Sequence, residues 1–137
     1  MVPSPVAEAF LREHTRTFLV TLRPDGAPTC HPMVGFWQDG ALWLNTYRKS
    51  AKARNLMRSP RVACVVVTDD DDPQFRGVVL RGRAELVESA APLRSGAARS
   101  PAVGGDVARL VQARLAEGKR VMVRIVPDEM RVVGEHR

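Results

Sequence analysis

The chain has 137 residues, of which 45% are apolar and 26% are charged, and its formal net charge is +6. This length corresponds to a single domain, which we assign to residues 1–137, and the composition is that of a folded globular protein. The longest apolar runs are shorter than ten residues, well below the ~20 that a membrane-spanning helix needs. The N-terminus lacks the basic start and apolar core of a signal peptide. We therefore expect a cytoplasmic protein without membrane association.

The positive charge indicates an anionic partner, either a nucleic acid or a phosphorylated small molecule. One cluster stands out, because four cations fall within the eight residues from Tyr47 to Arg54. Nucleic-acid binding by base stacking requires aromatic side chains among the cations. Aromatic residues make up only 5% of the chain, and Tyr47 is the one aromatic residue in this cluster. We therefore expect a small anionic ligand and no nucleic acid.

The first third of the chain has the pattern of a short helix followed by three strands. Ser4 and Pro5 provide a helix N-cap and a first helical turn, and Asp-Gly pairs follow the first and second strands, as in hairpin turns. Pro28 and Pro32 remove backbone donors from the second strand, which must therefore lie at a sheet edge or be bulged. The expected elements are a helix over about 5–14 and strands over Thr15–Arg23, Ala27–Trp37 and Ala41–Tyr47.

The rest of the chain adds helices between further strands. Ser50 caps a helix that stops before Pro60. Val78 and Leu80 mark the core face of a long strand. The expected elements are helices over Ser50–Arg58 and Asp106–Glu117, a loop over 89–105, and strands over Val62–Thr68, Arg76–Glu88, Arg120–Val126 and Met130–Val133. Hairpin-linked strands with few helices predict an α+β fold built on an antiparallel sheet or small barrel.

Signatures of metal binding and nucleophilic catalysis are missing from the sequence. The two cysteines, Cys30 and Cys64, form no CxxC pair, and we expect both to be small buried hydrophobic residues with free thiols. The acidic run Asp69–Asp72 lacks the ligand spacing of an EF-hand and is expected to be a solvated loop. No Ser/His/Asp or Cys/His set has a recognisable pattern, and no glycine-rich phosphate-binding loop occurs. We therefore expect no metal site.

A series of motifs over residues 19–67 carries a resemblance to a known family. In order it contains a strand, D-G-x-P, a second strand, D-G, a third strand, T-x3-S-x-K-x2-N-L and S-P-R-V. With the order of elements over about 6–135, it resembles the pyridoxamine 5′-phosphate oxidase-like, FMN-binding split β-barrel superfamily. More narrowly, it is similar to the flavin/deazaflavin oxidoreductases of that fold, many of which use coenzyme F-420. The resemblance implies a mainly antiparallel split β-barrel of six to seven strands with short peripheral helices, and a homodimer with two cofactor sites at the subunit interface.

The resemblance also implies where the cofactor, coenzyme F-420 or FMN, is held. Its phosphate would sit in the turn after the third strand, on Thr46, Ser50 and Lys52, with Arg48 and Lys49 nearby. Elementary chemistry agrees, because a loop that enters a helix N-terminus offers unpaired N–H groups and a favourable dipole to an anion. The second strand would line the flavin-type ring, largely through its backbone. The residues implied there are His31, Pro32, Met33 and Val34.

Three positions depart from the pyridoxamine phosphate oxidases proper. His31 stands where they have Arg, Ala51-Lys52 where they have Arg-Lys, and Gly77 near their usual Gln, so pyridoxamine phosphate oxidase activity is disfavoured. The expected function is an oxidoreductase that transfers hydride between the cofactor and a small organic substrate. His31 is the candidate proton donor because a histidine titrates near neutrality; the alternative is a hydrogen-bonded structural histidine. A non-catalytic carrier of FMN, F-420 or haem is the alternative function.

Overall fold

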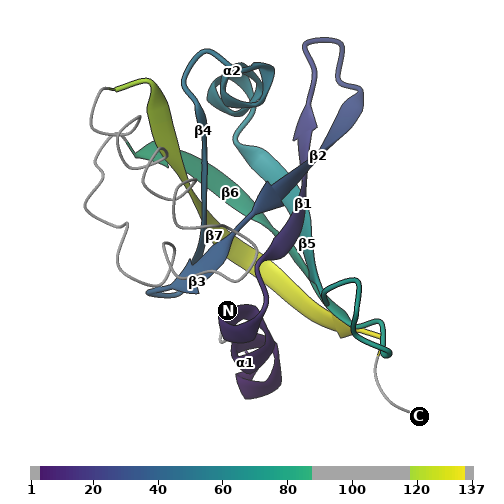
Figure 1. Cartoon of the computed structure of the whole chain (residues 1–137). Helices are drawn as coiled ribbons and strands as arrows, with labels where there is room; N and C mark the ends of the chain where they lie inside the picture. Colours follow the sequence, from purple (N-terminus) through teal and green to yellow (C-terminus); the bar gives the residue numbers. More distant parts are fainter. Residues whose placement is uncertain (1–3, 88–117, 135–137) are drawn as a thin grey trace.

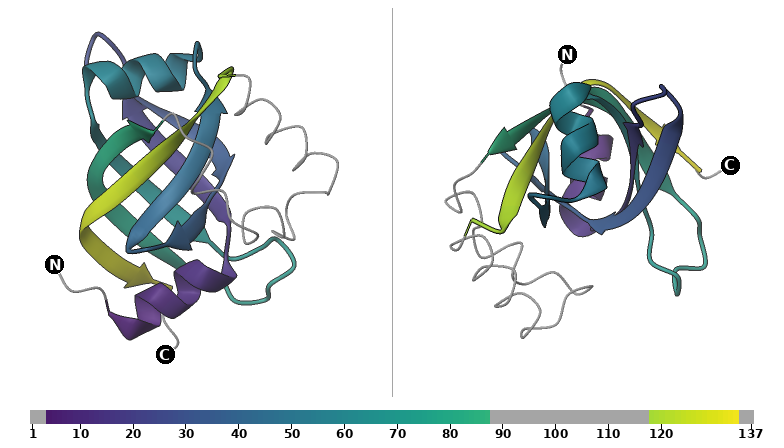
Figure 2. Two further views of the ribbon diagram at one scale, coloured as in Figure 1. Left: turned by 90° about the vertical axis from the view of Figure 1, so that its left-hand side faces the viewer. Right: turned by 90° about the horizontal axis from the view of Figure 1, so that it is seen from above.

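The computed structural model of the chain describes residues 4–87 and 118–134, so the expected loop over 89–105 and helix over 106–117 lie outside the described residues. The described elements are α1 (Pro5–Glu13), β1 (Arg16–Leu22), β2 (Pro28–Val34), β3 (Phe36–Gln38), β4 (Ala41–Tyr47), α2 (Ala51–Arg58), β5 (Arg61–Val67), β6 (Gly77–Val87) and β7 (Arg120–Val133). The strands form one antiparallel sheet in the order β2-β1-β5-β6-β7-β4-β3. This sheet curls around its own core, with α1 and α2 at opposite ends (Figures 1 and 2). The predicted α+β split barrel is confirmed.

The two edges of the sheet are joined through Gly35. β2 and β3 are the outermost strands, yet only this residue separates them in the chain. Its N–H donates to the Thr15 carbonyl at 2.8 Å. A Cβ at this position would lie 2.8 Å from Leu44 Cδ2 and 2.9 Å from Thr17 Oγ1. The single strand expected over Ala27–Trp37 is therefore wrong, because the chain leaves β1 at Gly35 to pair with β4.

β7 is one continuous strand where the sequence predicted two. The register with β6 shifts between Arg81 and Gly82, and Gly82 pairs with Pro127, so that Asp128 is an extra residue in a β-bulge. A Cβ on Gly82 would collide with the Val126 carbonyl. The glycine thus lets the two backbones approach closely. The Pro-Asp-Glu segment that the sequence indicated as a turn is absorbed within the strand.

The core fills the inside of the curled sheet. Val78 and Leu80 are fully buried, which confirms the predicted core face of β6. The helices add apolar side chains at the two ends, among them Leu11 from α1 and Leu56 from α2. β2 is an edge strand, as its prolines predicted. No helix in the described part of the chain is long and apolar enough to cross a membrane.

The two cysteines lie in different surroundings. Cys64 is buried in β5, and desolvation by burial raises the pKa of its thiol to about 12. Cys30 is exposed on β2. The prediction of a buried thiol is therefore right for Cys64 and wrong for Cys30, because Cys30 lies on the outward face of an edge strand.

Candidate functional site

The turn between β4 and α2 places two hydroxyl groups at the start of a helix. The Ser50 N–H donates to the Tyr47 carbonyl at 3.0 Å, which closes the turn. Ser50 Oγ accepts from the Ala53 N–H at 3.1 Å, so Ser50 is the N-cap of α2, as predicted. Thr46 Oγ1 lies 3.0 Å from Ser50 Oγ. Either hydroxyl can donate in this pair; when the buried Thr46 donates, the Ser50 hydroxyl hydrogen remains for an outside acceptor.

His31 on β2 and Lys52 on α2 face the same site. Lys52 occupies the first turn of α2 and is half-buried. His31 pairs with Leu19 of β1 and points to the same side of the sheet as this core residue. The pKa of His31 is lowered from its ordinary value of 6.5, first by desolvation and second by the positive charge of Lys52. The fold therefore brings together an imidazole and an ammonium group that the sequence placed on separate elements.

A chain of hydrogen bonds behind His31 reaches the far end of α2. His31 Nε2 lies 3.2 Å from Thr21 Oγ1, and Thr21 Oγ1 accepts from Asn55 Nδ2 at 3.1 Å. Asn55 Oδ1 accepts from Arg58 Nη2 at 2.9 Å. Sequence reasoning missed Thr21 and Arg58 as site residues. No sequence signal distinguishes Thr21 from Thr17, the other buried threonine of β1, because only the packing of α2 gives Thr21 its partners.

The residues implied to line the cofactor ring alternate between the two faces of β2. His31 and Met33 are half-buried, whereas Pro32 and Val34 are exposed on the opposite face. Their side chains therefore cannot all contact one ring. Among the described residues β2 pairs only with β1, which leaves its other backbone edge open. A contact through this edge, as the resemblance implies, stays a prediction.

The cations of the turn have different surroundings. Arg48 is bonded to the two residues before β7: its Nε donates to the Gly118 carbonyl at 2.8 Å, and its backbone N–H donates to the Lys119 carbonyl at 2.9 Å. Lys49 is exposed at the tip of the turn. Arg48 thus holds the turn against β7, and the predicted contacts of Arg48 and Lys49 with a phosphate stay predictions.

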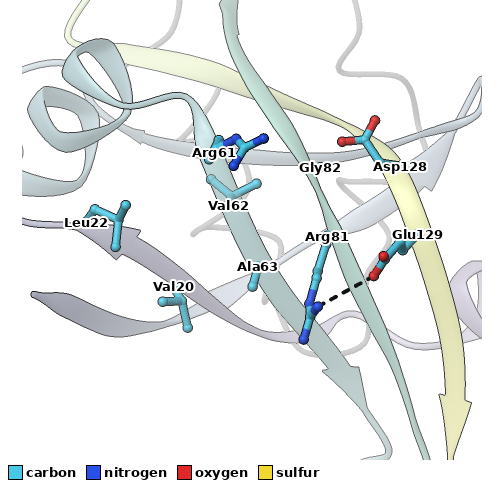
Figure 3. A pocket seen from close by; sticks show the side chains of 9 residues that line it. All are labelled: Val20, Leu22, Arg61, Val62, Ala63, Arg81, Gly82, Asp128 and Glu129. Carbon is cyan, nitrogen blue, oxygen red and sulfur yellow. Dashed lines mark ion pairs between the residues drawn. The ribbon is translucent and has the colours of Figure 1, made fainter. Parts of the chain in front are cut away.

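A cavity of about 400 Å³ lies elsewhere, on the outward face of the sheet (Figure 3). Val20, Ala63 and Arg81 are in register on neighbouring strands and line it. Arg81 Nη1 lies 3.6 Å from Glu129 Oε2, an ion pair at the rim. None of the residues predicted to bind the cofactor lines this cavity. Hydroxyl groups and the first N–H groups of a helix meet instead at the β4–α2 turn, and the binding of an anion there stays a prediction.

Comparison with known proteins agrees with this fold. The sequence profile of the family described as Pyridoxamine 5′-phosphate oxidase matches residues 4–134. The chain belongs to this family. The resemblance that the motifs carry is thereby confirmed at the level of the family.

Solved structures include both enzymes and binding proteins with this fold. A conserved hypothetical protein of Mycobacterium tuberculosis is 33% identical, with 96% of this chain and 85% of that one covered and a TM-score of 0.75. A protein described as an F420 reductase is 26% identical, with 95% and 98% covered and a TM-score of 0.72. The heme storage protein of Vibrio cholerae is 17% identical, with 96% and 95% covered and a TM-score of 0.70, and shares the fold alone. Among curated proteins, none has a sequence that matches this chain.

Proposed function

We propose that the protein is an oxidoreductase that binds coenzyme F-420 or FMN and transfers a hydride to or from a small organic substrate. The cofactor supplies the hydride chemistry when bound, and the chain supplies position and electrostatics. The observation that carries the proposal is the position of Ser50 and Lys52 at the N-terminus of α2, with His31 of β2 within reach of the Lys52 charge. The 26% identity to a protein described as an F420 reductase supports coenzyme F-420 as the first cofactor to test.

The residues at the β4–α2 turn fit a phosphate group. The N–H groups of Ala51 and Lys52 belong to the first turn of α2, where a helix has no internal acceptor for them. Ser50 offers a hydroxyl hydrogen, and Lys52 offers a point charge with three donors. The helix dipole adds to the same attraction. A phosphate there would be bound by backbone, hydroxyl and ammonium groups together.

We infer that a second copy of the chain covers the outward face of the sheet. The side chains that face outward on β2, β1, β5 and β6 are mostly apolar: Phe18, Val20, Cys30, Pro32, Ala63, Val65 and Val79. Arg61, Arg81 and Arg83 border this outer patch, which the cavity of Figure 3 adjoins. An apolar patch with a charged border is typical of an interface. Two copies related by a two-fold axis would each bury the same patch.

A carrier that binds the cofactor without turnover would use the same phosphate site, so activity has to separate the two functions. The histidines of the described residues are poorly placed to ligate haem. His31 Nε2 is engaged with Thr21, and the ring of His14 packs on Phe10 with centroids 4.2 Å apart. A flavin-type ligand held by its phosphate therefore suits the described geometry better than a histidine-ligated haem.

A paired titration tests the proposal. Purified protein is titrated with F-420 and with FMN, and binding is followed by cofactor fluorescence in the wild type, Lys52→Ala and Arg54→Ala. Arg54 is an exposed cation of the same helix, so its variant controls for the loss of one charge. Binding of either cofactor that is weakened only by Lys52→Ala supports the phosphate site, and failure of both cofactors to bind overturns it. Faster oxidation of the reduced cofactor by quinones or enones in the presence of protein distinguishes an enzyme from a carrier.

A further inference from the structure

We propose that Arg58, Asn55 and Thr21 form a positioning relay that holds the single ring proton of His31 on Nδ1, so that the Nδ1–H donates to the phosphate of the bound ligand. The last step rests on the phosphate site of the proposed function. The relay itself rests only on hydrogen bonds within this chain. Each hydrogen bond in the relay has a fixed donor and a fixed acceptor.

Arg58 sets the direction at the first step. Its Nη2 carries two hydrogens and has two acceptors, the Leu22 carbonyl at 3.0 Å and Asn55 Oδ1 at 2.9 Å. A guanidinium group only donates, so the Asn55 amide must turn its oxygen toward Arg58. The Asn55 Nδ2 then points the other way. Because Arg58 is bonded to the end of β1 and lies one turn after Asn55 on α2, it holds the amide in this orientation.

The Thr21 hydroxyl connects Asn55 to His31. Thr21 is fully buried, and its Oγ1 accepts from Asn55 Nδ2 at 3.1 Å. A hydroxyl has one hydrogen, and the second partner of Thr21 is His31 Nε2 at 3.2 Å. If Nε2 carried the ring proton, the Thr21 hydrogen would have no acceptor among the described residues, a state that buried polar groups avoid. Thr21 therefore donates to Nε2, and the proton of a neutral His31 lies on Nδ1.

The charges around His31 favour the same state. A doubly protonated ring would present an N–H to Thr21, which the relay makes a donor, so protonation would break the Thr21 contact. Lys52, on α2, is the charged group of the described chain whose field reaches His31, and it opposes a second positive charge. Arg58 is linked to His31 through the relay rather than by direct contact. His31 is thereby held as a neutral donor beside the Lys52 charge.

The relay is tested by the tautomer of His31. Histidine labelled with 15N gives distinct long-range proton–nitrogen patterns for the Nδ1–H and Nε2–H forms, and the chain contains only three histidines. At alkaline pH, where the ring is neutral, we expect the Nδ1–H pattern for the wild-type His31, with His31→Gln used for assignment. Thr21→Ser keeps the hydroxyl and should keep this pattern. An Nε2–H pattern in the wild type would overturn the relay.

Asn55→Asp is the most direct test of the relay. A carboxylate oxygen replaces the Nδ2 donor, so the Thr21 hydroxyl should donate to Asp and accept from His31, which moves the ring proton to Nε2. Arg58 keeps a carboxylate partner in this variant. Thr21→Val, which removes the hydroxyl, should also lose the wild-type pattern. A folded Asn55→Asp or Thr21→Val protein that retains a pure Nδ1–H pattern would contradict the relay.

Inorganic phosphate tests the ligand step separately. Added to the apoprotein, phosphate should shift the His31 Nδ1 and Nδ1–H resonances in the wild type and in Thr21→Ser, and much less in Lys52→Ala. If the tautomer is Nδ1–H but phosphate leaves it unshifted, the ligand step is wrong, whereas the phosphate site of the proposed function fails only if neither cofactor binds in the titration. The relay would stand in that case. The two failures are therefore distinguishable.

Discussion

Lys52 on α2 lies close enough to His31 on β2 for its charge to lower the pKa of the imidazole, in addition to the larger effect of desolvation. This relationship joins a helix start to an edge strand. Neither element alone forms the site, because the helix brings the ammonium, hydroxyl and N–H groups and the strand brings the imidazole. The predictions below test this pair, its neighbours and the fold that holds them.

The His31–Lys52 relationship predicts a pH effect. Because the folded pKa of His31 is depressed below the ordinary value of 6.5, the unfolded chain takes up the proton first as the pH falls. The contribution of His31 to stability is thus present above pH 6.5 and is lost as the pH falls from there through the folded pKa. Proton NMR titration of the ring should give a higher pKa for His31 in Lys52→Ala than in the wild type. An unchanged pKa in Lys52→Ala, or an equal rise in Arg54→Ala, would contradict the pairing.

Lys52→Ala should weaken cofactor binding by about 10- to 100-fold, the loss of one charge-assisted contact worth about 1.5–3 kcal/mol. The side chain is half-buried at the helix start, so the effect should exceed that of a surface charge. Titration calorimetry or fluorescence with F-420 or FMN measures it. Arg54→Ala should stay within about fivefold of the wild type, since an exposed charge contributes less than about 1 kcal/mol. Equal losses in both variants would indicate a general charge effect instead of a specific contact.

Ser50 has two roles that substitutions can separate. Ser50→Ala removes the N-cap of α2 and should lower the free energy of unfolding by about 1 kcal/mol. Ser50→Asp keeps a capping oxygen and should preserve stability, yet its negative charge should repel a phosphate and abolish cofactor binding. Thermal denaturation and the cofactor titration are measured on the same samples. Retained cofactor binding in Ser50→Asp would place the phosphate elsewhere.

Gly35→Ala tests the junction of the two sheet edges. The added Cβ would meet Leu44 and Thr17 at less than 3 Å, so the core must shift to admit it. We expect a loss of about 1–3 kcal/mol in the free energy of unfolding, the usual cost of overpacking, measured by urea denaturation. Arg54→Ala, on the exposed face of α2, should change stability by about 0.5 kcal/mol at most. A neutral Gly35→Ala would show that the edges tolerate separation.

The outer patch predicts the oligomeric state. Val65→Asp places a charge inside the patch, between Phe18 and Val79, and should convert a dimer into a monomer, as measured by sedimentation velocity. Met57→Asp is the control, because Met57 is 71% exposed on α2, away from the patch. Its variant should remain dimeric. A wild-type protein that sediments as a monomer at micromolar concentration would overturn the inferred interface.

Local chemistry in the sequence was sufficient for much of the site. The Ser50 cap, the edge position of β2 and the core face of β6 follow from residue types and spacing that act over a few neighbours. The motif series identified the family, and the cluster of positive charge marked the β4–α2 turn. These features depend on residues that are close together in the chain, so they can be predicted without the tertiary structure.

Other features depend on partners that are distant in the chain. β2 ends at Gly35 because the curled sheet brings Thr17 and Leu44 against it, and β7 stays whole because Gly82 makes room for its bulge. Both outcomes are contacts between strands, which local spacing does not encode. The exposure of Cys30 likewise depends on which strand ends the sheet.

The sequence by itself determined the family and most of the elements, and it predicted the donors of an anion site, because capping, turn chemistry and periodicity are local. Only the tertiary structure decided how His31 is held. Its partner Thr21 comes from β1 and takes its direction from Asn55 and Arg58 on α2. The direction of each hydrogen bond depends on all the donors and acceptors in this series. The series forms only when α2 packs against β1.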